Sequence, residues 1–358
     1  MNMRKWGRLL PYAVVGLPSL VILYLLTRSL KTTTPQLRAR NSALQDDSGP
    51  WEQLVAMMDG SKSLEALYAP QKLALVHSQK KHKITSTIQM SRHVALDNEC
   101  RSRNSSLAWR SLPEAARLAV AQRIVVNDQH ELLYCAVPLL SMGPWMKVLY
   151  YISPNRAEGL SDVGQVPGEE LGTRKNFVYL SSFSLDEQER RLNTYLSFMV
   201  SRHPFQRLAI AYKLKLENSN AFFHDRYGKA IVKNYRKGGG GKNPTGNDVK
   251  FSEFAQYISE VSVDDMNEHW QPLETLCQPC VVDYDVILHH ESMEREAEEL
   301  LGVAQLSSHL TKFPYNKWDS LEASYVHTLY RELSPSLVGR LVQLYRSDFG
   351  LFSYSSLL

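Results

Sequence analysis

The sequence predicts an α/β protein with a mostly parallel sheet, preceded by one N-terminal transmembrane helix. Short apolar runs of strand character alternate with segments of helical spacing, which is typical of a layered α/β fold. Of the 358 residues, 44% are hydrophobic and 22% are charged, a globular composition with enough length to bury a large core. An uncharged run near the N-terminus indicates the membrane helix.

The uncharged run covers residues 9–27 and follows Arg4 and Arg8. It is just long enough to span the hydrocarbon core of a bilayer, and no small-residue cleavage site follows it. We therefore favour an uncleaved signal anchor over a cleaved signal peptide. Residues 1–8 would form a short cytoplasmic tail, and the large remainder of the chain would be lumenal, as in a single-pass type II protein.

Two further regions follow the expected membrane helix. Residues 28–90 begin with a stretch rich in Thr, Pro, Ser and Asp, which favours a lumenal stem that buries little surface. Within them, residues 63–82 regain helical periodicity through their leucines. Residues 91–358 carry the alternating pattern and are expected to form the compact domain.

Inside the compact domain the apolar pattern predicts strands and helices in turn. The expected strands lie at 123–126 and 132–137, and residues 177–183 are expected to form a further strand or a loop. The other expected elements are helical, with a helix that gives way to a strand over 185–200 and helices at 145–152, 252–260 and 335–345.

The chain has four cysteines, Cys100, Cys135, Cys277 and Cys280. This even number permits two disulfides in three different pairings in an oxidising compartment. Cys277 and Cys280 have the spacing of a zinc knuckle, but no second pair of ligands lies nearby, so we expect disulfides or buried thiols and no metal. Asn104 opens a usable N-glycosylation sequon, which agrees with a lumenal domain.

The charge balance is only mildly basic. The formal net charge is +4 and the isoelectric point is about 8.7. This excess is too small to argue for a nucleic-acid partner, and none is expected. An anionic nucleotide or an acidic polysaccharide suits the balance equally well.

Residues 201–215 carry the strongest functional signal. An apolar strand-like run ends at Arg202, the chain breaks at His203 and Pro204, and helical spacing then resumes with Arg207 one turn into the helix. A strand that passes through such a turn into a helix offers backbone N–H groups and guanidinium groups to an anion such as phosphate. The alternative is an ordinary strand–turn–helix unit with solvated arginines.

Four blocks, in this order along the chain, resemble Golgi carbohydrate sulfotransferases of the HNK-1, chondroitin and dermatan 4-O-sulfotransferase group. They are RHPFQRL at 202–208, FSEF at 251–254, NEHWQPLETLCQPCVVDYD at 267–285 and YRSDFGLFSY at 345–354. The resemblance covers residues 95–355 and implies a P-loop-kinase-like sulfotransferase fold and a Golgi membrane location. It also implies transfer of a sulfuryl group from phosphoadenosine phosphosulfate (PAPS) to a hydroxyl of a glycan, which is either a glycosaminoglycan or a glycoprotein sugar.

The family binds the 3′-phosphate of PAPS with a loop of the form Arg-x-Pro-x-x-Arg-Leu-x-Ser. Arg202 and Arg207 match its two arginines, so the resemblance implies that they bind the donor. Ile210 occupies the serine position and cannot donate a hydrogen bond. One phosphate contact of the family is therefore missing.

The family's 5′-phosphosulfate loop, Pro-Lys-x-x-Cys-Thr-x-Trp-Lys, is altered more strongly at residues 138–147. Leu139 replaces the lysine and Gly143 replaces the threonine. Ser141, Lys147 and the backbone amides near Gly143 are the candidates that remain for binding the phosphosulfate. Loss of one preorganised charged donor costs on the order of 3 kcal/mol, or about a hundredfold in rate.

A base is also needed to accept the proton of the sugar hydroxyl. His269 is the candidate, because a neutral imidazole suits this task near neutral pH, and Glu268 is the second choice. The alternative is that His269 and Trp270 only pack the loop before Cys277.

Two functional interpretations remain. The favoured one is an active carbohydrate sulfotransferase with a glycan acceptor. The other is a catalytically weakened or inactive relative that binds an acidic glycan or a partner enzyme in the Golgi, for which Leu139, Gly143 and Ile210 argue. The oligomeric state is left open, and a homo-oligomer is compatible with the sequence.

Overall fold

The chain divides into two units, Met1–Pro50 and Trp51–Leu358. The computed structural model describes only residues of the second unit, namely 75–78, 81–84, 86–105, 107–238, 241, 243–308, 310, 312–315 and 321–355. The expected tail 1–8 and membrane span 9–27 lie outside the described residues, as does most of the expected stem 28–90. Among the residues described, no helix has the length and apolar character needed to cross a bilayer.

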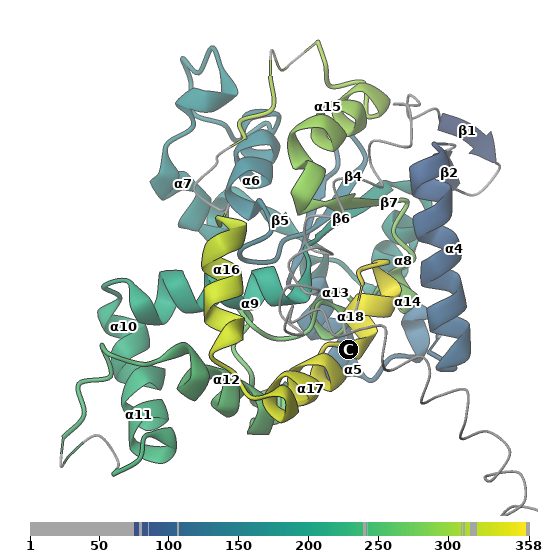
Figure 1. Cartoon of the computed structure of the whole chain (residues 1–358). Coiled ribbons are helices and arrows are strands. Elements are labelled where there is room, and N and C mark those ends of the chain that lie inside the picture. Colours follow the sequence, from purple (N-terminus) through teal and green to yellow (C-terminus); the bar gives the residue numbers. More distant parts are fainter. Residues whose placement is uncertain are drawn as a thin grey trace, which may run out of the picture. The chain divides into compact units, whose positions relative to one another are not determined.

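A five-stranded sheet with the strand order β5-β3-β4-β6-β7 forms the centre of the second unit (Figure 1). Its strands are β3 (Ile124–Asn127), β4 (Leu132–Cys135), β5 (Val178–Tyr179), β6 (Leu196–Ser201) and β7 (Val286–His289). β4, β6 and β7 pair in parallel, whereas β3 pairs antiparallel with both of its neighbours.

The described sheet is therefore mixed, and the expectation of a mostly parallel sheet is wrong for the side formed by β3 and β5. The reason is local. Only residues 128–131 connect β3 to β4, and a connection this short permits a hairpin, whereas a parallel crossover needs a dozen or more residues.

Helices pack around the sheet, and α9, α12, α16 and α17 pack together in a separate layer (Figure 1). Their bounds are α4 (Thr87–Ser102), α5 (Glu114–Ala121), α6 (Met142–Tyr151), α7 (Gly168–Gly172), α8 (Leu185–Thr194), α9 (Pro204–Tyr212), α10 (Ala221–Phe223), α11 (Lys229–Tyr235), α12 (Phe251–Glu260), α13 (Leu273–Cys277), α14 (Pro279–Val282), α15 (Met293–Val303), α16 (Ala323–Arg331), α17 (Pro335–Leu344) and α18 (Arg346–Leu351). The helices expected within 145–152, 185–200, 252–260 and 335–345 are confirmed, as are the strands expected within 123–126, 132–137 and 185–200.

The helical periodicity noted over 63–82 is wrong where it can be checked. β1 (Leu75–Ser78) and β2 (Lys81–Ile84) pair antiparallel in a separate two-stranded hairpin. The run of leucines matches a helical spacing, but strand pairing prevails over such a weak local preference. The first long helix, α4, begins at Thr87 with the Ser86 side chain as its N-cap.

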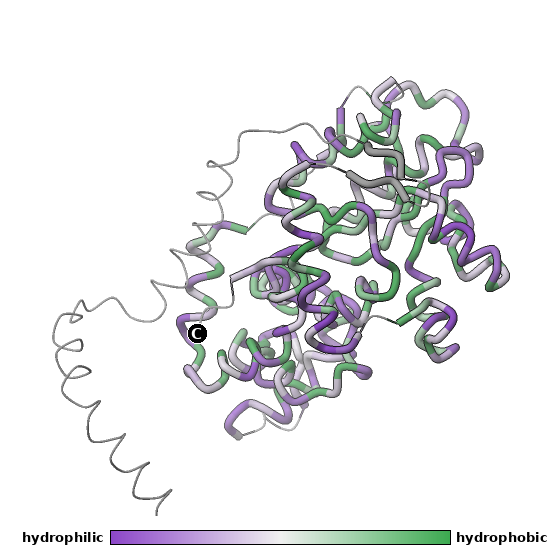
Figure 2. Tube along the Cα trace, turned by 90° about the vertical axis from the view of Figure 1, so that its right-hand side faces the viewer, coloured by the Kyte–Doolittle hydropathy of each residue, from purple (hydrophilic) through white to green (hydrophobic). Residues whose placement is uncertain are grey.

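Two hydrophobic clusters hold the described residues together. The first surrounds the sheet, whose strands β4 and β6 are buried along their whole length because helices cover both faces. Trp145 of α6 packs there against Phe198 of β6, with ring centres 4.6 Å apart. The second cluster joins α9, α12, α16 and α17. In Figure 2 the hydrophobic stretches of the chain gather in the interior, while hydrophilic stretches lie at outer turns and helices.

The four cysteines form two disulfides, Cys100–Cys280 and Cys135–Cys277. The first joins α4 to α14, and the second joins the end of β4 to α13. The structure thus selects one of the three pairings that the sequence leaves open, with the two cysteines of the Cys277–Cys280 pair bonded to different partners. Asn104 is exposed, and its glycosylation stays a prediction.

Candidate functional site

Three loops meet at the carboxyl ends of the parallel strands β4, β6 and β7. Residues 136–141 follow β4, Arg202 and His203 follow β6, and His290 and Glu291 follow β7. Because these strands are parallel and adjacent, the loops lie at one edge of the sheet, where open α/β sheets bind their ligands.

Hydrogen bonds join each of these loops to the other two. Arg202 Nη1 donates to the carbonyl oxygen of Leu139 (3.2 Å), and the His203 N–H donates to Glu291 Oε1 (2.8 Å). Ser141 Oγ lies 3.0 Å from His290 Nδ1. The predicted site residues Arg202 and Ser141 therefore lie at one junction, which His290 and Glu291 of the third loop complete.

The turn that carries Arg202 is built to be rigid. His203 is the N-cap of α9, and its Nδ1 accepts a hydrogen bond from the Phe205 N–H, while Pro204 occupies the first helical position. Arg202 is only 1% exposed. A guanidinium this well buried needs acceptors or negative charge close by, and the Leu139 carbonyl oxygen is one of the partners that the protein itself supplies.

The loop between β4 and α6 turns sharply through two residues with left-handed backbones. Leu139 has φ 67° and Ser141 has φ 55°, and α6 begins immediately afterwards at Met142. The first N–H groups of a helix attract anions. Around Gly143 there is open space, because an added Cβ would meet no atom within 4 Å. The backbone is thus accessible at the residue expected to contact the phosphosulfate.

Two side chains of this loop region, those of Leu139 and Lys147, contact other parts of the protein, and donor binding by Lys147 stays a prediction. The side chain of Leu139, at the position of the family lysine, packs against the second hydrophobic cluster. Lys147 Nζ lies 3.5 Å from the carbonyl oxygen of Gly164, so it engages a segment outside the three loops.

Arg207 contacts a neighbouring loop of the protein, and its expected contact with the donor stays a prediction. Its Nη1 donates to the carbonyl oxygen of Gln271 and its Nη2 to that of Glu268, both at 2.6 Å. The side chain is buried, and this burial lowers the pKa of the guanidinium to about 10. Arg207 therefore braces the loop that carries His269.

His269 is held in one tautomer. Its Nδ1 lies 2.5 Å from Asn267 Oδ1, and Asn267 is itself oriented by a hydrogen bond from its Nδ2 to the Tyr227 hydroxyl (3.1 Å). An amide oxygen only accepts, so Nδ1 carries the hydrogen and Nε2 carries the lone pair. Burial lowers the pKa of His269 to about 3, and the positive charges of Lys215, Arg207 and Arg123 add to this effect. The imidazole is neutral and its Nε2 is free of a proton.

Cations from three parts of the chain surround His269. Arg123 forms an ion pair with Glu268 (2.6 Å), and Lys215 Nζ lies 4.9 Å from the centre of the Phe223 ring. The same ring contacts His269 edge-on at 5.3 Å. Arg123 belongs to no recognisable motif, and Lys215 is the last residue of the segment 201–215, so only the fold shows that both lie near His269.

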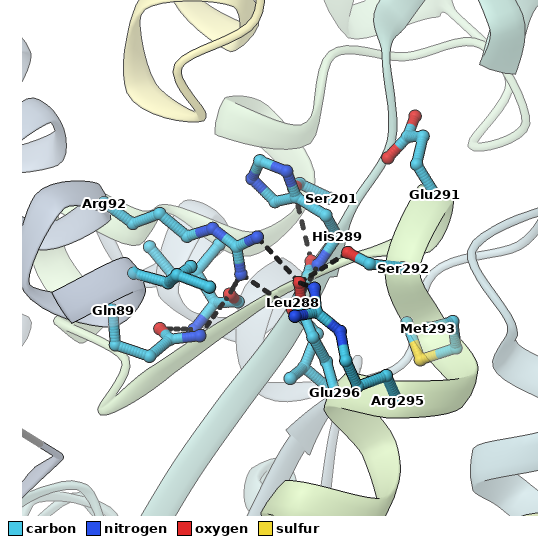
Figure 3. Close-up of polar contacts among 12 residues, drawn as sticks. Gln89, Arg92, Ser201, Leu288, His289, Glu291, Ser292, Met293, Arg295 and Glu296 are labelled. Atoms are coloured by element: carbon cyan, nitrogen blue, oxygen red, sulfur yellow. Dashed lines mark hydrogen bonds and ion pairs between the residues drawn. The ribbon is translucent and has the colours of Figure 1, made fainter. Parts of the chain in front are cut away.

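His290 and Glu291 were also missed, although a signal was present. They directly follow an apolar run that ends at the same sheet edge as Arg202, but no motif in the sequence marks them as site residues. Figure 3 shows the Glu291 side chain directed away from the ion pair of Arg92 and Glu296 at the end of β7. In the described part of the chain no group of three or more His, Cys, Asp or Glu side chains could hold a metal ion.

Comparison with known proteins identifies the class to which this fold and site belong. Residues 122–355 match the model of the sulfotransferase family. Carbohydrate sulfotransferase 11 of Rattus norvegicus is 31% identical over 313 residues, covering 83% of this chain and 82% of the relative. Carbohydrate sulfotransferase 14 of Danio rerio is 33% identical over 270 residues, covering 75% and 71%. Carbohydrate sulfotransferase 8 of Homo sapiens is 32% identical over 240 residues, covering 65% and 55%. No solved structure matches the chain.

The chain belongs to the sulfotransferase family, and its relatives are carbohydrate sulfotransferases. The resemblance read from the four sequence blocks is confirmed. The protein is a sulfotransferase that acts on carbohydrate.

Proposed function

We propose that the enzyme transfers the sulfuryl group of PAPS to a glycan hydroxyl at the junction of the three loops. The observation that supports this site is the buried Arg202 at the carboxyl end of β6, hydrogen-bonded to the loop after β4. In this arrangement Arg202 binds the 3′-phosphate of the donor, and Arg207 keeps the acceptor side in place. Ser141 and the amides near Gly143 contact the phosphosulfate.

The reaction breaks the bond between sulfur and the phosphate oxygen and forms a bond from sulfur to the sugar oxygen. Nε2 of His269 takes the hydroxyl proton, and the phosphate of phosphoadenosine phosphate (PAP) leaves with the bonding electrons. In-line positioning and neutralisation of the leaving phosphate supply most of the catalysis in such transfers. Burial is the main cause of the low pKa of His269, and a bound anionic donor counteracts only the smaller contribution of the neighbouring cations.

Glu268 is less suited to the role of base. Its carboxylate is already paired with Arg123. A carboxylate in an ion pair is stabilised in its charged form and takes up a proton less readily. Glu268 and Arg123 therefore support His269 rather than replace it.

A second candidate function is favoured by one observation, the apolar packing of Leu139 at the lysine position. Without that lysine, catalysis is slower by about a hundredfold. The protein would then act mainly by binding an acidic glycan or a partner enzyme.

We also propose that the enzyme is a single-pass type II protein of the Golgi membrane, with residues 9–27 as the anchor, 28–90 as the stem and 91–358 as the lumenal catalytic domain. Two disulfides among the described residues support an oxidising compartment. Asn104 would carry a glycan there, and a homo-oligomer is compatible with this arrangement.

The test uses the full-length protein in detergent. Titration with PAP by calorimetry should show binding in the wild type and its loss in Arg202→Ala. Arg110→Ala is the matched control, because Arg110 is 52% exposed and pairs only with surface carboxylates. A wild type that binds no PAP at millimolar concentration would contradict the proposal. A transfer assay with labelled PAPS over chondroitin, dermatan and N-glycan acceptors identifies the glycan.

A further inference from the structure

We propose that Tyr354, near the C-terminus, is a positioning residue that holds the Arg202 turn of the donor site in its binding geometry. This inference rests on the proposed function. Tyr354 lies in the fourth of the sequence blocks, which has no role in the reaction described above. Its hydroxyl and its ring both contact the ends of β6 and β7.

The hydroxyl of Tyr354 acts on the turn through Glu291. It donates to Glu291 Oε2 (2.8 Å), while Glu291 Oε1 accepts from the backbone N–H of His203 (2.8 Å). The carboxylate thus bridges the C-terminal tail to the residue that directly follows Arg202. The same hydroxyl lies 3.2 Å from Ser201 Oγ, on the residue that directly precedes Arg202. Tyr354 therefore reaches both neighbours of Arg202 in the chain.

The ring of Tyr354 is packed between two histidines. It stacks on His289 at 4.8 Å and contacts His203 edge-on at 5.5 Å. His203 is the N-cap of α9, and His289 is the last residue of β7. The ring therefore fills the space between the two turns that the Glu291 carboxylate joins.

The tail itself is placed by local structure. α18 ends at Leu351, Ser353 then has a left-handed backbone, and the Tyr354 N–H donates to the carbonyl oxygen of Phe349 (2.9 Å). Phe349 also contacts the His203 ring, 5.5 Å between centres, and the backbone of Ser355 hydrogen-bonds to that ring. Such a tail holds Tyr354 against the turn without a bound ligand.

These contacts preorganise the Arg202 turn for binding the donor phosphate. A phosphate that needs the Arg202 guanidinium in one place loses affinity when the turn can move, because displacements near 1 Å at a binding group are costly. Removal of the Tyr354 hydroxyl should leave the fold intact and loosen the link between Glu291 and Ser201. The effect should therefore be specific to donor binding.

The test compares Tyr354→Phe with Tyr212→Phe in the full-length protein. Tyr212 is also buried, and its hydroxyl donates to the carbonyl oxygen of Val249 (2.8 Å), at the opposite end of α9 from the Arg202 turn. Tyr354→Phe should weaken PAP binding by roughly 3- to 10-fold, raise the KM for PAPS in proportion and leave kcat nearly unchanged. It should also speed hydrogen exchange at the His203 amide. Tyr212→Phe should change none of these quantities.

Two results would overturn the positioning role alone. The first is unchanged PAP affinity in Tyr354→Phe beside a wild type that binds. The second is an equal loss of affinity in both variants together with equal falls in the thermal midpoint, which would mark a general loss of stability. If the wild type itself binds no PAP, the proposed function and the positioning role fall together.

Discussion

Arg202 and Leu139 are joined by a hydrogen bond of 3.2 Å from the arginine Nη1 to the leucine carbonyl oxygen. This bond links the turn after β6 to the loop after β4, although the two residues are 63 positions apart. Leu139 occupies the lysine position of the family loop, so its backbone stays in the site while its side chain packs into a hydrophobic cluster. The loop is joined to the arginine that we propose to bind the donor, and it lacks the positive charge of the family lysine.

Leu139→Lys should therefore raise kcat by about 10- to 100-fold, because it restores a cation beside the leaving phosphate. It should also lower the free energy of unfolding by about 1–2 kcal/mol, because Leu139 is partly buried. Steady-state kinetics and chemical denaturation measure the two effects. Leu139→Met is the control and should leave kcat unchanged. An equal kcat in Leu139→Lys and wild type, with PAP still bound, would refute the idea that this missing charge limits the rate.

His269→Gln should lower kcat by about 10²- to 10⁴-fold, the usual contribution of a general base, and leave the Kd for PAP within about twofold. Glutamine can keep a polar contact with Asn267 but cannot accept the proton. His130→Gln, in the turn between β3 and β4, is the control and should retain full activity. If His269→Gln also turns over normally, the residue only packs the loop.

Acid should destabilise the protein below about pH 6.5. Burial lowers the pKa of His203 to about 4 and the pKa values of His269 and His289 to about 3. An unfolded histidine has a pKa of about 6.5, so the unfolded chain binds protons first as the pH falls. Stability is therefore lost from about pH 6.5 down to about 4 for His203 and to about 3 for His269 and His289. Each histidine lowers the free energy of unfolding by up to about 1.4 kcal/mol for every pH unit within its range. Asp348 offsets the effect of one histidine below about pH 6. Burial raises the pKa of Asp348 to about 6, so the folded state takes up a proton on this carboxylate before the unfolded state does.

His269→Gln gives a direct check of this pH dependence. Denaturation of the variant between pH 6.5 and 4 should show a shallower loss of unfolding free energy than the wild type. The two remaining histidines keep the slope from vanishing. Parallel slopes in the two proteins would show that His269 is not neutral in the folded state.

The disulfide Cys135–Cys277 should contribute to donor binding as well as to stability. Cys135 is the last residue of β4, directly before the loop that contains Leu139. Its removal by paired alanine substitutions should lower the free energy of unfolding by about 2–4 kcal/mol and weaken PAP binding. Removal of Cys100–Cys280, which joins α4 to α14, should lower stability similarly and leave PAP binding intact. Equal effects of both pairs on binding would indicate general unfolding instead.

Arg92 and Glu296 form a buried ion pair at 2.7 Å that attaches α4 to α15 at the end of β7 (Figure 3). Arg92 also donates to the Ile287 carbonyl oxygen at 2.6 Å. Arg92→Met should cost about 3–5 kcal/mol of unfolding free energy, because the Glu296 carboxylate loses its cation in the interior. Adding Glu296→Leu should recover much of this loss, and a double-mutant cycle by denaturation measures it. Additive losses would show that the pair does not interact.

The sequence predicts those parts of the fold whose pattern is local. The strands β3, β4 and β6 and the helices α6, α12 and α17 follow from runs of apolar residues at strand or helix spacing. β7 was not expected as a strand, because a four-residue apolar run beside a cysteine-containing segment does not differ from a loop or a short helix by periodicity. The antiparallel pairing of β3 with β4 makes the sheet mixed, and the spacing of apolar residues does not predict which strands pair or in which direction.

The same distinction between local pattern and long-range packing applies to the candidate site. The sequence by itself determined the class of protein, the arginine turn at a strand end and the loss of the lysine at Leu139, because each of these is a property of consecutive residues. Only the tertiary structure decided the cysteine pairing, the brace from Arg207 to the His269 loop and the contacts of Arg202's neighbours with Glu291 and Tyr354. Ser201 and Tyr354 are 153 positions apart, and His203 and Glu291 are 88 apart. Contacts over such separations depend on how strands and helices pack together, and no local preference of the chain encodes them.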